Sequence, residues 1–310
     1  MLALNLKKID FMAMRKVALI VSLVLIVISV LSLAIRGLNL GLDFTGGTVL
    51  TASYPESVDP QHIREVLAEK NFDASVQNFG SSKEVLIRLA PQEGKKESRI
   101  VEEVIVVLQA DNAGFVAGQS RRLGAQIGEE LRDDGGLAML YALVGILIYV
   151  AFRFELRFSA GAIAALVHDV IITLGFFSVT GVEFDLTVLA AILAIIGYSL
   201  NDTIVVFDRV RENFLIHLKK TPEEVVNLSI NNTLTRTLVT SLTTLLVLIA
   251  LYLFGGEVMA AFALALIVGV VVGTYSSIYV ASSSLLMLGV TKESLLPPDP
   301  EEDEELSKIP

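Results

Sequence analysis

Apolar residues gather in six long runs along the chain, and polar segments separate them. The runs cover residues 17–35, 137–152, 159–180, 186–206, 238–254 and 259–288. A helix needs about 20 predominantly apolar residues to cross the roughly 30 Å hydrocarbon core of a bilayer, and each run is at or near that length. The pattern therefore predicts a polytopic α-helical membrane protein with six transmembrane helices, of which the second and fifth are the shortest.

The long segment 36–136, between the first two runs, has the pattern of a folded domain instead. We predict strands at 48–54, 74–79, 84–89 and 114–119, and helices at 59–71 and 95–110. Asp59 followed by Pro60 is a typical helix start. The order βαββαβ is that of an α+β ferredoxin-like sandwich. That fold hosts many functions and does not by itself indicate one.

Composition supports the membrane assignment and excludes several kinds of chemistry. Hydrophobic residues make up 53% of the 310 residues and charged residues 19%, an apolar excess that a bilayer explains. The formal net charge of −10 argues against nucleic acid as a partner. The chain has no cysteine and only three scattered histidines, so thiolate sites and an imidazole metal cluster are excluded. We therefore expect no metal and no cofactor.

The first run follows basic residues, which is also how a secretory signal peptide begins. Its 19 residues exceed the usual apolar core of such a peptide, which is about 7–15 residues. The run continues into Arg36-Gly37-Leu38, which is not a small-residue cleavage site. We interpret the run as a retained first span.

The distribution of lysine and arginine predicts the orientation. Outside segment 36–136 and the C-terminal tail, all eleven basic residues lie before the first run, between the second and third, or between the fourth and fifth. With six spans these places share one side, the cytoplasm by the positive-inside rule. Segments 1–16, 207–237 and 289–310 are then cytoplasmic, and 36–136 is exported. The acidic end of the tail, from Pro297, is expected to be solvated.

Ionisable residues inside the apolar runs need a reason, since each costs roughly 2.5–3.5 kcal/mol on insertion scales. In the fourth run, Tyr198, Ser199 and Asp202 share a helical face, and Asn201 lies beside them. In the third run, His168 and Asp169 lie near the middle of the bilayer.

The fifth run begins with a polar stripe of Asn232, Arg236 and Thr240. Arg236 enters from the cytoplasmic side and Asp202 lies near the cytoplasmic end of its own run, so we expect the two to pair. Such a carboxylate and cation could relay protons by alternating between paired and protonated states. The alternatives are a static pair that fixes packing and a histidine, His168, that only bonds a neighbouring helix.

Several stretches together resemble the SecF family of bacterial protein-export subunits. They are Gly41 to Thr48 (GLDFTGGT), Gly197 to Asn213, Val167 to Asp169, Arg236-Thr237 and Tyr252 to Gly256, in the family's order along essentially the whole chain. The stretch in the fourth run is the most specific of them.

The resemblance implies an RND-superfamily half bundle in the bacterial inner membrane that pairs with the homologous subunit SecD. It further implies work with the SecYEG channel and YajC, with protons as the coupling ion and a translocating preprotein as the cargo. In the family, the positions of Asp202 and Arg236 are tied to proton flow, and Asp169 is a supporting candidate. The Asp43–Gly46–Gly47 motif could form a hinge between membrane and domain or a static tight turn.

Two other functions stay open. The RND relationship allows a small-molecule efflux transporter, although roughly 100 exported residues are few for a drug-sized cavity. A passive scaffold of the export complex would use the same charges only for packing. An enzyme is not expected, because no nucleophile–base constellation or phosphate loop is visible.

Overall fold

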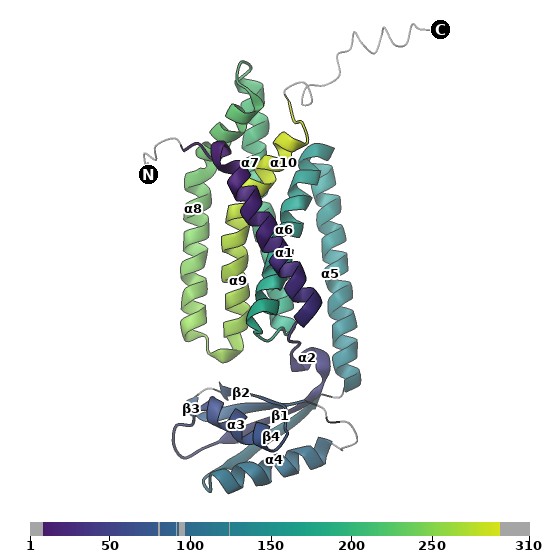
Figure 1. Cartoon of the computed structure of the whole chain (residues 1–310), viewed down its shortest axis with the longest axis vertical. Coiled ribbons are helices and arrows are strands. Elements are labelled where there is room, and N and C mark those ends of the chain that lie inside the picture. The colour runs from purple at the N-terminus through teal and green to yellow at the C-terminus, as the bar shows by residue number, and fades with distance from the viewer. Residues whose placement is uncertain (1–8, 80, 91, 93–96, 124, 292–310) are drawn as a thin grey trace, which may run out of the picture.

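A bundle of long helices carries a small α+β domain at one end in the computed structural model, which describes residues 9–79, 81–90, 92, 97–123 and 125–291 (Figure 1). The bundle helices are α1 (Arg15–Arg36), α5 (Ala125–Arg153), α6 (Leu156–Thr180), α7 (Leu186–Ile216), α8 (Pro222–Phe254) and α9 (Glu257–Ser276). The last span continues through a π-helical turn (Ser277–Ala281) into α10 (Ser282–Met287), and a 3₁₀ turn (Met12–Met14) precedes α1.

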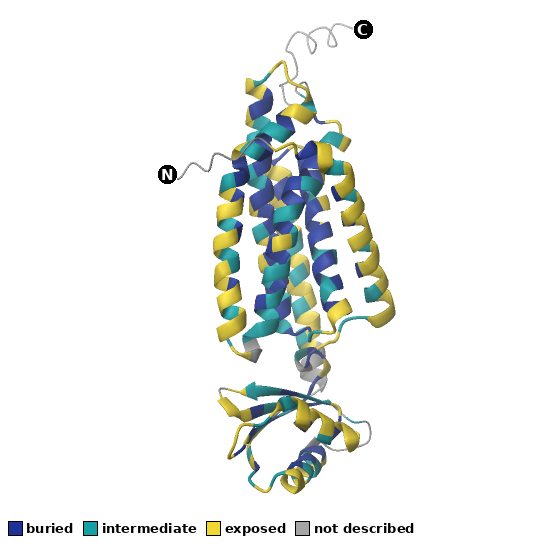
Figure 2. Cartoon of the chain, turned by 60° about the vertical axis from the view of Figure 1, so that its left-hand side comes forward, coloured by how far each residue is buried: buried dark blue, intermediate teal, exposed yellow. Residues whose placement is uncertain are grey.

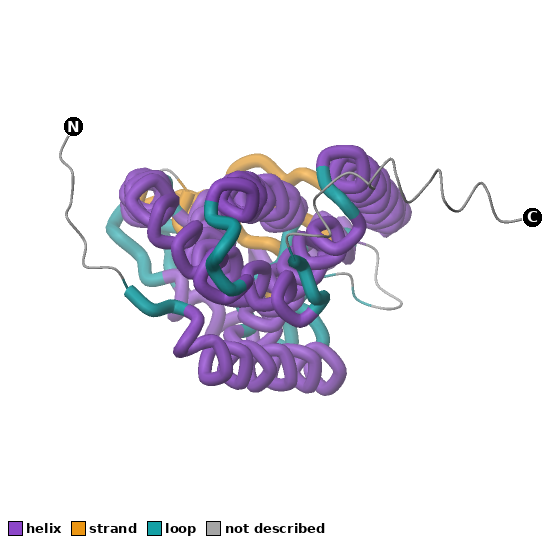
Figure 3. Tube along the Cα trace, turned by 90° about the horizontal axis from the view of Figure 1, so that it is seen from above, coloured by secondary structure: helices purple, strands orange, loops and turns teal. Residues whose placement is uncertain are grey.

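Six helices of the described residues are long and apolar enough to cross a membrane, as predicted. Helices α6 and α7 form the centre, where buried residues gather (Figure 2), and about half of their apolar windows is buried. In α5 only 6% of the apolar window is buried. Helix α1 crosses the face of the bundle at a slant, as the view along the long axis shows (Figure 3). The acidic tail from Pro297 lies outside the described residues.

The helices are longer than the apolar runs that predict them. Helix α5 begins at Ala125, before the predicted domain end at 136, and α7 and α8 extend through most of the predicted loop 207–237. Only residues 217–221 separate α7 from α8. Thr221 caps α8 in a full capping box with Glu224. An apolar stripe continues beyond the membrane-length run, which is why hydropathy alone ends these helices too early.

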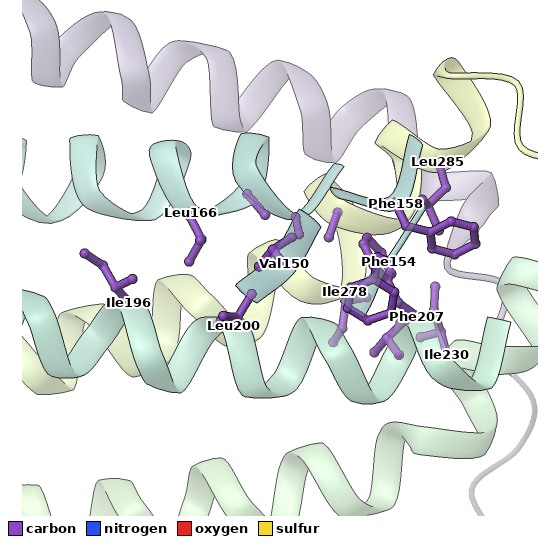
Figure 4. Close-up of a cluster of buried hydrophobic side chains, with 14 of the residues drawn as sticks. Val150, Phe154, Phe158, Leu166, Ile196, Leu200, Phe207, Ile230, Ile278 and Leu285 are labelled. Atoms are coloured by element: carbon purple, nitrogen blue, oxygen red, sulfur yellow. The ribbon is translucent and has the colours of Figure 1, made fainter. Parts of the chain in front are cut away.

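A cluster of buried hydrophobic side chains packs between the helices of the bundle (Figure 4). Phe207 meets Phe154 and Phe158 edge to face, with ring centroids 5.8 and 5.3 Å apart. Phe158 and Phe207 are fully buried, and Ile278 packs in the same cluster. This aromatic contact joins α6 and α7 to the last span.

The domain is a four-stranded antiparallel sheet in the order β2-β3-β1-β4, which confirms the predicted ferredoxin-like order of elements. The elements are β1 (Gly47–Ser53), α3 (Pro60–Glu69), β2 (Ala74–Phe79), β3 (Ser81–Leu89), α4 (Glu97–Asp111) and β4 (Val116–Leu123). Asp59 caps α3 by accepting a hydrogen bond from the Gln61 amide, as predicted. Helices α3 and α4 bury Leu67 and Leu108 completely in one core with β1 and β3.

A short segment after α1 holds the domain against the bundle. It contains the one-turn helix α2 (Leu42–Thr45). The Gly41 amide donates to the Phe184 carbonyl over 2.8 Å, and the Phe184 amide donates to the Asn39 carbonyl over 2.7 Å. An ion pair of 2.8 Å between Arg88 of β3 and Glu183 adds a second link. The domain is therefore attached to the α6–α7 connection as well as to its own chain neighbours.

Candidate functional site

A buried carboxylate with hydrogen-bond partners on both oxygens lies at the centre of the bundle. Asp169 of α6 is 1% exposed. Its Oδ2 accepts hydrogen bonds from Ser199 Oγ of α7 at 2.5 Å and from Ser276 Oγ of α9 at 2.7 Å. Its Oδ1 lies 2.8 Å from Nδ1 of His168. Three helices of the bundle thus supply polar contacts to this one side chain.

His168 extends the network to the first span. It is 3% exposed, and its Nε2 lies 3.1 Å from Ser22 Oγ of α1. Ser22 donates to the Tyr275 hydroxyl at 3.2 Å, and that hydroxyl donates to the Ala18 carbonyl at 2.6 Å. His168 and Asp169, which the sequence places near the middle of the bilayer, are therefore part of a chain of polar contacts that joins α6 to α1 and α9.

Glycine at two positions lets the helices approach closely enough for these contacts. A Cβ at position 175 of α6 would collide with Ser29 of α1, and a Cβ at position 269 of α9 would collide with Ile195 of α7. Small residues at helix interfaces are the usual means of close packing in membranes. The hydroxyls of Ser22, Ser199 and Ser276 reach their partners because of this packing.

A second carboxylate, Asp202 of α7, is 5% exposed and lies one helical turn from Ser199. It accepts a hydrogen bond from Thr237 Oγ1 of α8 at 3.1 Å, and Ser277 Oγ lies at the long distance of 3.5 Å. Ser276 and Ser277 are consecutive residues at the start of the π-helical turn, and each faces a different carboxylate. The last span therefore contacts both acidic centres.

The predicted ion pair between Asp202 and Arg236 is not formed. In the described part of the chain, Arg236 is exposed and makes no ion pair with Asp202, although it is near enough to act on that carboxylate electrostatically. Asn201 and Asn232 are also exposed, and Thr240 is half-buried. The predicted stripe on the fifth span thus lies mainly on the outer face of the bundle.

The inward stripe of α8 is offset by one residue from the predicted one. Thr233, Thr237 and Ser241 are buried. Ser241 Oγ accepts a hydrogen bond from the Tyr198 hydroxyl at 3.2 Å and lies 2.7 Å from Thr274 Oγ1. Both stripes are polar and recur every four residues, so spacing alone could not tell which faces inward.

Sequence reasoning missed six contributors to the two centres. They are Ser22, Thr237, Ser241, Tyr275, Ser276 and Ser277. A signal was present for some of them, because serines cluster at 276, 277 and 282–284 in the last apolar run. A serine hydroxyl in a helix can, however, donate to a backbone carbonyl of the preceding turn. Such a cluster therefore does not by itself indicate a site.

The glycine motif after α1 takes the chain from α2 into β1 with positive φ. Gly46 has φ 70° and Gly47 has φ 140°, values that side chains disfavour. Asp43 has a role of its own, since its Oδ2 accepts a hydrogen bond from the Leu186 amide at 3.3 Å at the first turn of α7. Asp185 caps the same helix through the Val188 amide.

The fold defines a multi-pass membrane protein that buries ionisable groups inside its spans, and such groups are often functional. Two family profiles match the chain: the SecD/SecF GG motif over residues 31–54, and the C-terminal region of protein export membrane protein SecD/SecF over residues 105–291. The chain belongs to the SecD/SecF family of protein export membrane proteins.

Within that family its curated relatives are SecF subunits. The protein translocase subunit SecF of Vibrio alginolyticus is 48% identical over 96% of this chain and 95% of its own length. The SecF of Pseudomonas aeruginosa is 50% identical over 94% of each chain. The chain is thus a SecF-type subunit of the accessory complex of the Sec protein translocase, as the sequence resemblance predicts.

Solved structures agree. The crystal structure of SecDF from Thermus thermophilus, described as a translocon-associated membrane protein, has a TM-score of 0.77 and 40% identity over 93% of this chain. SecDF in its super-membrane-facing form has a TM-score of 0.72 and 37% identity. The present chain spans about two fifths of those SecDF chains, 39% and 41% respectively.

Proposed function

We propose that this chain, as the SecF half of a complex with SecD, uses proton movement across the bacterial inner membrane to help preproteins complete export through SecYEG, with YajC as a further partner. No enzymatic step is involved, and protons are the only coupling ion. The chain ends and the loop between α7 and α8 lie in the cytoplasm, and the ferredoxin-like domain lies outside.

The observation that carries the proposal is the setting of the two carboxylates. Asp169 and Asp202 are buried at membrane depth, and in the described residues no lysine or arginine makes an ion pair with either one. An isolated ionised carboxylate is very costly to bury, so each of the two depends on the polar partners that the neighbouring helices supply. Hydroxyls and an imidazole, which can donate or accept, suit a group that gains and loses a proton.

The exposed polar face supports a partner subunit. Arg236, Asn201 and Asn232 are exposed on α7 and α8, where lipid contact would be costly. The SecDF relatives combine a second part with the part that matches this chain. A SecD bundle that covers this face would place its own groups beside Arg236, and the relay would be completed between the two subunits.

The available energy is adequate for mechanical work. One elementary charge that crosses the membrane releases about 2.3 kcal/mol per 100 mV. Helix α1 connects the His168 network directly to the segment that holds the exported domain. A rearrangement at the relay therefore has a short path to the domain.

The test is Asp202→Asn in a chain co-expressed with its SecD partner. We expect normal assembly, measured by co-purification, and loss of the export stimulation that an imposed proton gradient gives in inverted vesicles. Thr243→Ala is the matched control, because the Thr243 hydroxyl bonds only backbone of its own helix in the described structure. Normal proton-dependent stimulation in the Asp202→Asn variant contradicts the relay, and failure to assemble supports the passive scaffold instead.

A further inference from the structure

A groove lined wholly by apolar side chains lies between α5 and α6, and the proposed proton relay does not use it. It has a volume of about 250 Å³. The lining includes Leu143, Ile146 and Leu147 of α5 and Ile163, Val167 and Ile171 of α6. These residues belong to predicted spans, so the groove lies at membrane depth.

The groove is open to the lipid that surrounds the bundle, because most of α5 is not packed against the other helices. Only 6% of the apolar window of α5 is buried, against 56% for α6. Exposed apolar residues recur along α5, among them Leu140, Val144 and Ile148. Leu147 is 40% exposed and Val167 is 51% exposed, whereas Val150, nearer the α5–α6 connection, is fully buried. The two helices meet near their connection and leave the groove open beyond it.

The width of the groove indicates what it can hold. From Ile163 to Ile171 the α6 wall rises about 12 Å, at 1.5 Å per residue. The space along that wall is about 250 Å³ and has only aliphatic sides. A helix with its side chains is about 10–12 Å across and too wide to enter it. A single hydrocarbon chain is narrow enough.

Two arginines flank the α5–α6 connection, at one end of the groove, because Arg153 ends α5 and Arg157 lies in the first turn of α6. Arg153 and Arg157 are each six residues, or about 9 Å of helix, from the nearest groove residues Leu147 and Ile163. Both are exposed. Arg153 donates to Asp208 at 2.6 Å and Arg157 to the Gly289 carbonyl at 2.5 Å. A guanidinium has five N–H donors in a geometry that fits phosphate, so each side chain has further donors to offer.

We propose that the groove holds one acyl chain of an anionic phospholipid whose headgroup phosphate binds Arg153 and Arg157. The depths match, because the groove begins about 9 Å from the arginines and the hydrocarbon of one leaflet is about 15 Å thick. The lipid fills the gap that separates α5 from α6. Since α5 follows β4 directly, the bound lipid supports the helix that leads from the exported domain into the bundle.

The test uses the purified complex of this chain with its SecD partner in phosphatidylcholine nanodiscs. Each sample contains a small amount of phosphatidylglycerol or phosphatidylcholine that carries a photoreactive diazirine on one acyl chain. Mass spectrometry then maps the labelled peptides. We expect the phosphatidylglycerol probe to label the groove residues of α5 and α6 several-fold more than the phosphatidylcholine probe does.

Two variants separate the acyl chain from the headgroup. Val167→Trp fills the groove and should remove the labelling there, whereas Val247→Trp on the exposed face of α8, where Val247 is 68% exposed, should not. Arg157→Gln keeps the groove open and should lower phosphatidylglycerol labelling towards the phosphatidylcholine level. The labelling of the Arg157→Gln variant tests the headgroup contact even if the Val167→Trp variant fails to assemble.

Equal labelling by both probes on α5, α6 and α8 would indicate ordinary surrounding lipid and overturn the proposal. If neither the groove peptides nor the SecD peptides are labelled, the partner subunit covers the groove. This result also overturns the proposal. Neither result bears on the relay, which depends on Asp202.

Discussion

The hydroxyl of Ser276 should be coupled energetically to the carboxyl of Asp169. Ser276 is completely buried, and its Oγ donates to Asp169 Oδ2 at 2.7 Å. A hydrogen bond to a charged group contributes about 1.5–3 kcal/mol and a bond between neutral groups about 1 kcal/mol. Ser199 supplies a second donor at 2.5 Å to the same oxygen. We therefore expect Ser276→Ala to cost about 1–3 kcal/mol, without unfolding the bundle.

The measurement is a double-mutant cycle of Ser276→Ala and Asp169→Asn in the purified complex. Thermal unfolding gives the stability of each variant, and energised vesicles give the proton-stimulated export rate. We expect a coupling free energy of about 1–2 kcal/mol in stability, because removing the charge at position 169 weakens the bond that Ser276 makes. Export stimulation should fall in both single variants.

Ser284→Ala is the control for this cycle. Ser284 lies on the same span, and its hydroxyl donates to the Val280 and Ala281 carbonyls of that span. It should be additive with Asp169→Asn to within about 0.5 kcal/mol. If Ser276→Ala is equally additive, the Ser276–Asp169 contact contributes nothing specific and the reasoning is refuted.

Three further predictions concern the domain, the packing of α1 on α6, and the attachment of the domain to the bundle. Burial and the nearby Asp111 carboxylate raise the pKa of Tyr54 to about 12, and its hydroxyl has no hydrogen-bond partner among the described residues. Tyr54→Phe should therefore stabilise the domain. It should also remove the loss of stability that the wild-type domain shows as the pH rises from about 10 to 12, which hydrogen exchange can follow. Gly175→Val should weaken the α1–α6 packing by about 1–3 kcal/mol in thermal unfolding, whereas Gly145→Val, in open space, should not. Arg88→Glu should speed proteolysis between α1 and the domain, and Glu183→Arg in the same chain should restore protection.

The parts of the fold that local pattern specifies could be predicted from sequence. The six spans follow from the lengths of the apolar runs, and the domain follows from its alternating strands. The turn at Gly46 and Gly47 follows from the only residue type that adopts positive φ without strain. Helix ends were less predictable, because α7 and α8 continue as amphipathic helices after their apolar runs end.

The site depends on which helices are neighbours, and local pattern does not contain that information. Ser22 and His168 are 146 positions apart, and Asp169 and Ser276 are 107 apart. The Asp202–Arg236 pair was predicted incorrectly for the same reason. Spacing does not fix the rotation of α8 about its axis, and a shift of one residue exchanges its inward and outward polar stripes. Asp202 instead contacts Thr237, the next residue along.

The way α1 is held indicates where the domain can move. Ser22 binds α1 to His168, and near its other end Ser32 lies 2.8 Å from Ser178 of α6. The segment after α1 is then fixed to the start of α7 through Asp43. The His168–Asp169 pair is therefore connected by hydrogen bonds to α1, and α1 and the segment after it are connected to α6 and to the start of α7. Because this attachment ends at Asp43, movement of the domain relative to the bundle should concentrate at the positive-φ turn that follows it, with the Arg88–Glu183 pair as the restraint to be released.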